Sequence, residues 1–158
     1  MKRSFRIGFS FGLTSGIVGT LGLMVGLNSS TSSKLVVIGG ILAIAIAEGF
    51  SEAVSIHVTE EFENTHTERE VWESTFSTLI CKFAFSAMFI IPVLLFDLEI
   101  AIILSILFGL YMLFLISLSI ARERNVEPWK LIAKHISIAV FVIFATHYIG
   151  LWLSATCG

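Results

Sequence analysis

The stretch AEGFSEAVSIHVTEEFENTHTERE, residues 47–70, begins in one of the most apolar parts of the chain and contains seven glutamates. An ionised carboxylate is costly to bury unless it is paired or serves a function. What these glutamates do therefore depends on where the helix that carries them lies. The composition of the whole chain bears on that question first.

The composition is that of an integral membrane protein. Of the 158 residues, 56% are hydrophobic and 14% are charged, and the mean hydropathy is +0.92. Soluble domains carry about 25% charged residues. A helix needs roughly 20 apolar residues to cross about 30 Å of hydrocarbon. Segments of this kind cover residues 7–27, 35–55, 76–96, 100–120 and about 133–153. The sequence thus predicts an all-α polytopic protein, with one transmembrane domain over residues 1–158 and five spans.

Positive charge is distributed unevenly between the two sides. The links NSSTSSK and FDLE hold one lysine between them. Seven further positive residues precede the first span or follow the fourth: Lys2, Arg3, Arg6, Arg122, Arg124, Lys130 and Lys134. The positive-inside rule places the N-terminus in the cytoplasm and the C-terminus outside or in a lumen. On this orientation the second and third helices are expected to extend into the cytoplasm as an acidic helical hairpin, about residues 57–75.

The second span carries the most costly charge. At 1.5 Å per residue, Glu48 is expected roughly 21 Å beyond Lys34, inside the hydrocarbon, and Glu52 near the cytoplasmic boundary. Ionisable groups at such depth usually face a bundle interior or a water-filled cavity and mark an ion path. A helical projection places five polar residues within a sector of roughly 80°. This polar stripe consists of Glu48, Glu52, Ser55, Thr59 and Glu63.

Lys82 in the third span also needs a partner, and Glu48 or Glu52 is the expected one. If Lys82 neutralises one of these glutamates and the later carboxylates are solvated, the stripe needs no function.

In the first span, Gly12, Gly16 and Gly19 have the spacing that lets membrane helices pack closely.

The remainder of the opening stretch predicts a chain reversal near residues 64–67. Thr67 and Glu70 have the spacing of a capping box, which would begin a new helix. Glu63 and His66 have the Glu-x-x-His spacing of helical di-metal sites, although a solvated acidic face explains the same residues. The carboxylates on the two sides of this reversal are Glu60, Glu61, Glu63, Glu68, Glu70 and Glu73.

Two segments resemble motifs of the vacuolar iron transporter family. SGIVGTLGLMVGL in the first span is similar to the family's DGLxxxxxLxxGL, and AEGFSEAVSI in the second is similar to AExxxGAISM. RNVEPWKLIAKH and HYIG are weaker matches. The resemblance covers nearly the whole chain and suggests a small prokaryotic-type member in a cell membrane. It implies a homodimer that exports Fe²⁺ and related divalent metals from the cytoplasm in exchange for protons.

The resemblance assigns Glu48 to the family's glutamate in the second helix. Ser15 stands where the family has an aspartate, and Ile56 stands where it has a methionine. Ser15 and Glu48 are expected roughly 12 Å and 9 Å from the cytoplasmic boundary, close enough in depth to meet. We also hypothesise that Glu52 replaces the carboxylate that is missing at Ser15.

These observations predict a divalent metal transporter. Carboxylates and histidine suit Fe²⁺ and Mn²⁺, and a carboxylate at membrane depth could exchange a proton for a metal ion. The expected metal ligands are Glu48, Glu52, Glu60, Glu63, His66, Glu70 and Glu73, and the expected path is Ser15, Glu48, Glu52, Ser55 and Thr59. The expected partners are lipid, divalent metal and a second copy of the chain, without nucleic acid or a permanently bound cofactor.

Two other functional classes are alternatives to this prediction. A non-transporting membrane protein of the same fold could bind metal or a basic partner through its acidic hairpin. The residues at positions 15 and 56 favour that alternative. An enzyme is not expected, because no nucleophile–base pair or cofactor-binding loop is evident.

Overall fold

The computed structural model describes residues 3–63 and 67–157, and these are almost entirely helical, with no strand among them. Five segments are long and apolar enough to cross a membrane, the third comprising two successive helices. This confirms the prediction of an all-α chain with five apolar helices and suggests an integral multi-pass membrane protein. The helices are α1 (Arg3–Thr31), α2 (Lys34–Glu63), α3 (Glu68–Met88), α4 (Ile90–Leu95), α5 (Leu98–Arg124) and α6 (Pro128–Cys157).

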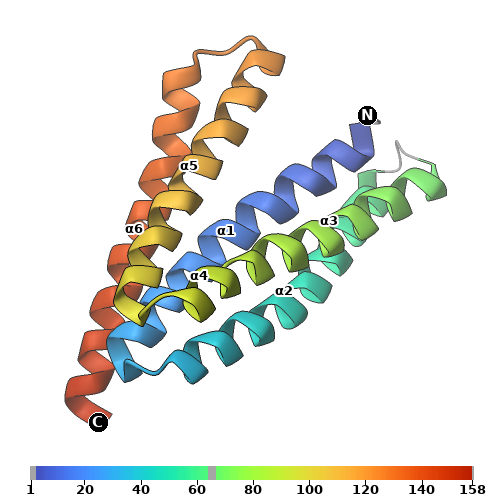
Figure 1. Ribbon diagram of the computed structural model, residues 1–158. Coiled ribbons are helices and arrows are strands. Elements are labelled where there is room, and N and C mark those ends of the chain that lie inside the picture. The colour runs from blue at the N-terminus through green and yellow to red at the C-terminus, as the bar shows by residue number, and fades with distance from the viewer. Residues whose placement is uncertain (1–2, 64–66, 158) are drawn as a thin grey trace.

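The central helix is α1, which lies between the α2–α3 pair and the α5–α6 pair (Figure 1) and contacts all four of these helices. Its glycines allow the close approach. A Cβ on Gly12 would lie 2.6 Å from the Thr78 carbonyl oxygen of α3, and one on Gly150 of α6 would lie 2.5 Å from the Gly26 carbonyl oxygen. The expected close packing of the glycine-rich helix is confirmed, and its partners within the chain are α3 and α6.

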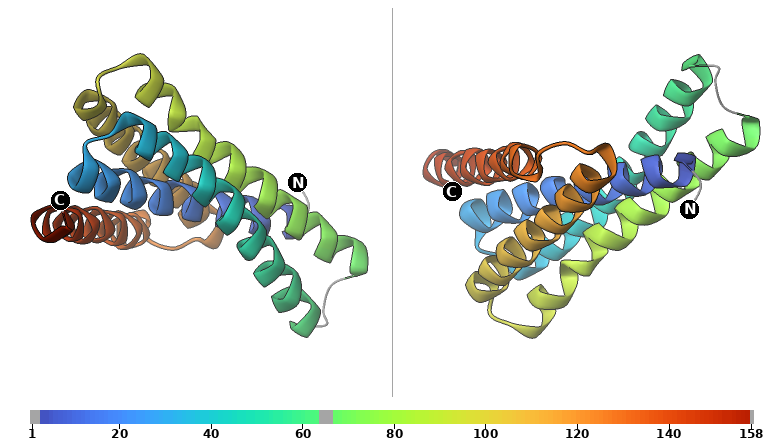
Figure 2. Two further views of the ribbon diagram at one scale, coloured as in Figure 1. Left: turned by 90° about the horizontal axis from the view of Figure 1, so that it is seen from below. Right: turned by 90° about the horizontal axis from the view of Figure 1, so that it is seen from above.

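Helix α2 continues past residue 55 to Glu63, and α3 begins at Glu68. The Thr67 backbone N–H and side-chain hydroxyl donate to Glu70 Oε2 at 3.0 and 2.8 Å, which confirms that this pair begins a helix. The predicted reversal includes residues 64–66, and these, His66 among them, lie outside the described residues. In both views of Figure 2 the ends of α2 and α3 nearest this connection stand apart.

The third span is not one continuous helix. Helix α3 ends at Met88, and the Phe89 N–H donates to the Ser86 carbonyl oxygen at 3.2 Å, closing a tighter turn before α4 begins. Pro92 lacks an N–H and cannot donate to the carbonyl of Met88, one turn earlier, so the α-helical ladder is interrupted there. Residues 76–96 therefore form two helical pieces that are interrupted at Phe89.

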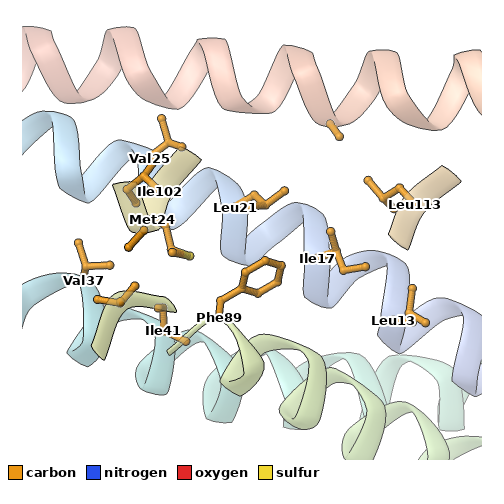
Figure 3. Close-up of a cluster of buried hydrophobic side chains, with 13 residues drawn as sticks. Leu13, Ile17, Leu21, Met24, Val25, Val37, Ile41, Phe89, Ile102 and Leu113 are labelled. Atoms are coloured by element: carbon orange, nitrogen blue, oxygen red, sulfur yellow. The ribbon is translucent and has the colours of Figure 1, made fainter. Parts of the chain in front are cut away.

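The hydrophobic core lies along α1 and is shown in Figure 3. Phe89 extends from the break between α3 and α4 toward α1 and is 1% exposed. The most deeply buried residues around it come from several helices: Ile17, Leu21 and Met24 of α1, Val37 and Ile41 of α2, Val93 of α4 and Leu113 of α5. Tight apolar packing of this kind leaves little room for water.

The two termini lie at opposite ends of the bundle (Figure 1), as an odd number of spans requires. Arg6 near the start of α1 forms an ion pair with Glu123 near the end of α5. This contact brings the two positively charged regions of the sequence to one end of the bundle. Their assignment to the cytoplasm remains a prediction of the positive-inside rule.

Candidate functional site

A buried ammonium group joins two glutamates between α2 and α3. Lys82 of α3 has a fully buried side chain, and its Nζ lies 2.6 Å from Glu48 Oε2 and 2.9 Å from Glu52 Oε1. The expectation that Lys82 pairs with one of these glutamates is confirmed, and the lysine contacts both. At membrane depth such charges are stable only when they are paired.

A third helix contributes a hydroxyl group to the same place. Ser15 of α1 donates a hydrogen bond to Glu52 Oε2 over 2.5 Å. The four residues Ser15, Glu48, Glu52 and Lys82 together form what we call the Lys82 cluster. Its two carboxylates and one ammonium leave one formal negative charge when all three groups are ionised. Three of the five residues expected to form a path thus meet at one point.

Glycines surround the lysine side chain on two sides. A Cβ on Gly19 of α1 would lie 3.2 Å from Glu48 Oε2 and 3.5 Å from Lys82 Nζ. A Cβ on Gly16 would lie 3.6 Å from Lys82 Cδ, and one on Gly49 of α2 would lie 3.8 Å from Lys82 Cγ. These glycines do more than let backbones approach, because they leave space around the lysine stem and its ammonium.

Access to the cluster is asymmetric. The Glu48 side chain is 44% exposed and that of Glu52 is 20% exposed, whereas that of Lys82 is completely buried. Glu48 borders an open groove between α1 and α2 whose other lining residues are Leu23, Leu27, Val36, Gly39, Gly40, Ala43, Ile44 and Ala47. Among the charged residues of the cluster, Glu48 is thus the most accessible and Lys82 the least.

The rest of the predicted stripe does not join the cluster. Ser55 and Thr59 are exposed, and their hydroxyls donate to the Ser51 and Ser55 carbonyl oxygens of the same helix, each at 2.8 Å. The buried side of α2 instead follows Val37, Ile41, Ala45, Gly49, Ala53 and Glu60. Glu48 and Glu52 lie at the edge of that side and reach Lys82 because glutamate side chains are long.

The acidic residues near the α2–α3 connection have different surroundings. Glu60 is buried, Glu63 is exposed, and Glu73 accepts a hydrogen bond from Arg69 Nε at 3.1 Å. Glu70 caps the start of α3. Within residues 3–63 and 67–157, no three His, Cys, Asp or Glu side chains lie close enough to hold a metal ion. The described parts of this region do not assemble a metal centre.

Several histidines have specific polar contacts that the sequence did not reveal. His57 Nδ1 lies 3.0 Å from Thr75 Oγ1, and the His57 ring lies 4.6 Å from that of Trp72. His57 thereby links α2 to α3 beyond the Lys82 cluster. Two further pairs fasten α6, namely His135 with Ser117 and His147 with Ser29, each at 2.7 Å. Single histidines without a spacing pattern gave no signal for these contacts.

Comparison of the chain with protein-family models, curated proteins and solved structures gives no match. The resemblance to vacuolar iron transporters therefore rests on the sequence motifs of the first and second spans. Among the described residues, the Lys82 cluster is the structural feature that bears most directly on function.

Proposed function

We propose that this protein is a divalent metal transporter in which Glu48 and Glu52 bind the transported cation. The supporting observation is the convergence of Glu48, Glu52 and Ser15, from two helices, inside an apolar bundle. Glu48 lies roughly 21 Å along α2 from Lys34, a depth at which an ionisable group usually serves an ion path. Carboxylate and hydroxyl oxygens favour Mn²⁺ and Fe²⁺ over soft metals such as Cu⁺.

The contact between Ser15 and Glu52 supports the compensation hypothesis. The family has an aspartate at the position of Ser15, and here a carboxylate oxygen of Glu52 lies 2.5 Å from the Ser15 hydroxyl. A negative charge is thus supplied to nearly the same point from the neighbouring helix. The ligand set of the proposed site consists of Glu48 and Glu52, with Ser15 orienting Glu52.

We include a homodimer in this proposal. Glu48 is 44% exposed and borders a groove whose other lining residues are apolar, so in a single copy its carboxylate would face lipid. That exposure is unfavourable at membrane depth. A second copy packed over the groove between α1 and α2 would shield Glu48 and could enclose a polar path at the interface.

The proposed direction of transport is export from the cytoplasm coupled to protons. On the positive-inside orientation, the acidic ends of α2 and α3 would lie in the cytoplasm. Its carboxylates would raise the local concentration of divalent cations near the entrance. Glu60, Glu63, His66, Glu70 and Glu73 are proposed to attract cations there.

One observation favours a second candidate function. The ammonium of Lys82 already neutralises part of the glutamate charge, as it would in a pair that only holds α2 against α3. In that case the chain would be a non-transporting membrane protein whose acidic hairpin binds cations or a basic partner.

Flux measurements on reconstituted protein separate the two candidates. Proteoliposomes should take up Mn²⁺ or Fe²⁺ in a saturable manner, and a pH gradient should change the rate. Glu48→Gln should lower the rate about tenfold or more, whereas Glu99→Gln, at the exposed start of α5, should leave it unchanged. Absence of flux for Fe²⁺, Mn²⁺, Co²⁺ and Zn²⁺, with and without a pH gradient, would refute transport. Metal binding without flux would support the second candidate.

A further inference from the structure

The least expected member of the Lys82 cluster is the lysine itself. A metal site built from two carboxylates has no obvious use for a cation of the protein at its centre. We propose that Lys82 is a tethered counter-cation that occupies the metal site when it is empty, and that a divalent metal must displace it from Glu48 and Glu52. This inference rests on the proposed function, because it takes both glutamates as ligands.

The geometry does not allow a metal ion and the Lys82 ammonium to contact both glutamates at the same time. Lys82 Nζ lies within hydrogen-bonding distance of one oxygen from each glutamate, at 2.6 and 2.9 Å. It therefore occupies the position from which a bound ion would contact both carboxylates. A divalent ion there would lie about 2 to 2.6 Å from its oxygen ligands and would repel an ammonium at such short range. Metal binding is then an exchange of cations rather than an addition.

The charge of Lys82 stabilises the site when no metal is bound. An empty site with Glu48 and Glu52 ionised and no lysine would hold two unpaired negative charges in an apolar bundle, which is strongly unfavourable. Lys82 neutralises one of these two negative charges as long as no metal is bound. The same ammonium then competes with the metal, so it lowers the affinity of the site.

The Lys82 side chain is buried among glycine backbones of two helices. Buried side chains are normally enclosed by other side chains at crystal-like density. The lysine stem instead runs past Gly16, Gly19 and Gly49, which have none. The pair is also reachable from one side, because Glu48 borders the open groove between α1 and α2. The glutamates are thus the side of the cluster nearest the groove, and the ammonium lies on the buried side.

Two buried hydroxyls without a hydrogen-bond partner lie further along the same helices. Ser86 is one turn beyond Lys82 on α3, and Thr20 follows Gly19 on α1. Both are fully buried, and within the described residues their hydroxyl oxygens have no hydrogen-bond partner. Buried hydroxyls are usually satisfied, so these two can accept a hydrogen bond from Lys82 after it leaves the glutamates.

Titration of the purified full-length protein with Mn²⁺, followed by the electron paramagnetic resonance signal of free Mn²⁺, tests the exchange. Lys82→Met removes the competing cation and should tighten Mn²⁺ binding about tenfold or more. Lys134→Met, at an exposed lysine near the start of α6, should bind Mn²⁺ as the wild type does. If folded Lys82→Met protein binds Mn²⁺ no more tightly than the wild type, the inference is wrong.

Lys82→Arg keeps the positive charge and provides a second test if Lys82→Met does not fold. A guanidinium can pair with carboxylates through two parallel hydrogen bonds and is harder to displace. Lys82→Arg should therefore bind Mn²⁺ more weakly than the wild type, and equal or tighter binding would overturn the inference. If the wild type and all variants fail to bind Mn²⁺, the proposed function fails and the inference with it. If the wild type binds and the Lys82 variants do not differ from it, only the inference fails.

Discussion

The Ser15 hydroxyl and the Glu52 carboxylate are joined by a 2.5 Å hydrogen bond although the two residues are 37 positions apart in sequence. The compensation hypothesis links these two residues, because Ser15 stands where the family motif has an aspartate and Glu52 is proposed to supply the missing carboxylate. Their direct contact supports that hypothesis, because it puts the Glu52 carboxylate next to the position where the resemblance predicts an aspartate.

A swap of the two side chains tests this compensation. Glu52→Ser alone removes a ligand and should weaken Mn²⁺ binding about tenfold or more. Adding Ser15→Asp to that variant returns a carboxylate to the same point and should restore most of the affinity. Binding can be measured by Mn²⁺ titration, with Ser15→Asp alone as the reference for the effect of an extra charge. A double variant as weak as Glu52→Ser would show that the two positions are not equivalent.

The shared lysine predicts non-additive effects on stability. Glu48→Gln and Glu52→Gln each leave Lys82 with one carboxylate partner. The double variant removes both carboxylates and leaves the fully buried ammonium without either of them. An unpaired buried charge is costly, and coupled residues depart from additivity. The fall in Tm of the double variant should exceed the sum of the single falls by about 4 °C or more in the same detergent. Glu99→Gln should leave Tm unchanged, and additive falls would contradict a shared partner.

Glycine substitutions distinguish an effect on metal binding at the Lys82 cluster from an effect on helix packing elsewhere. A Cβ on Gly19 would lie 3.2 Å from Glu48 Oε2, whereas one on Gly109 would lie 2.6 Å from Leu21 Cδ1, away from the Lys82 cluster. Gly19→Ala should change the Mn²⁺ affinity severalfold, because it restricts the groups that exchange. Gly109→Ala should lower Tm and leave the affinity of the folded protein unchanged. Equal affinities for both variants would mean that Gly19 serves packing alone.

The buried hydroxyls near Lys82 give a further prediction. Thr20→Val keeps the shape of the side chain and removes an acceptor, as Ser86→Ala does on α3. If these hydroxyls receive the displaced ammonium, the double variant should bind Mn²⁺ more weakly while its helical circular dichroism stays the same. Replacing them should also make little difference in a Lys82→Met background, where no ammonium needs an acceptor. A loss of affinity that persists in that background would point to a structural effect.

The sequence predicted the parts of the structure that depend on length, hydropathy and local chemistry. These are the five apolar helices, the start of α3 at the Thr67 and Glu70 cap, and the pairing of Lys82. The rotation of α2 was not predictable in the same way, because it is set by packing against α3. Ser55 and Thr59 consequently face outward although they share a sector with Glu48. The break at Phe89 also escaped prediction, since membrane helices often tolerate a proline.

The groove between α1 and α2 leads to a prediction about oligomeric state. A Cβ on Gly39 would have no heavy atom within 4 Å, so Gly39→Leu should not disturb the fold of a single copy. Gly39 lines the groove beside Glu48, and a leucine there would block a second copy from packing closely over it. Light scattering in detergent should show a dimer for the wild type and a monomer for Gly39→Leu. Ala133→Leu, on an exposed position of α6, is the matched control and should remain dimeric. A dimeric Gly39→Leu protein would place the interface elsewhere, and the exposed Glu48 carboxylate would then need another partner at membrane depth.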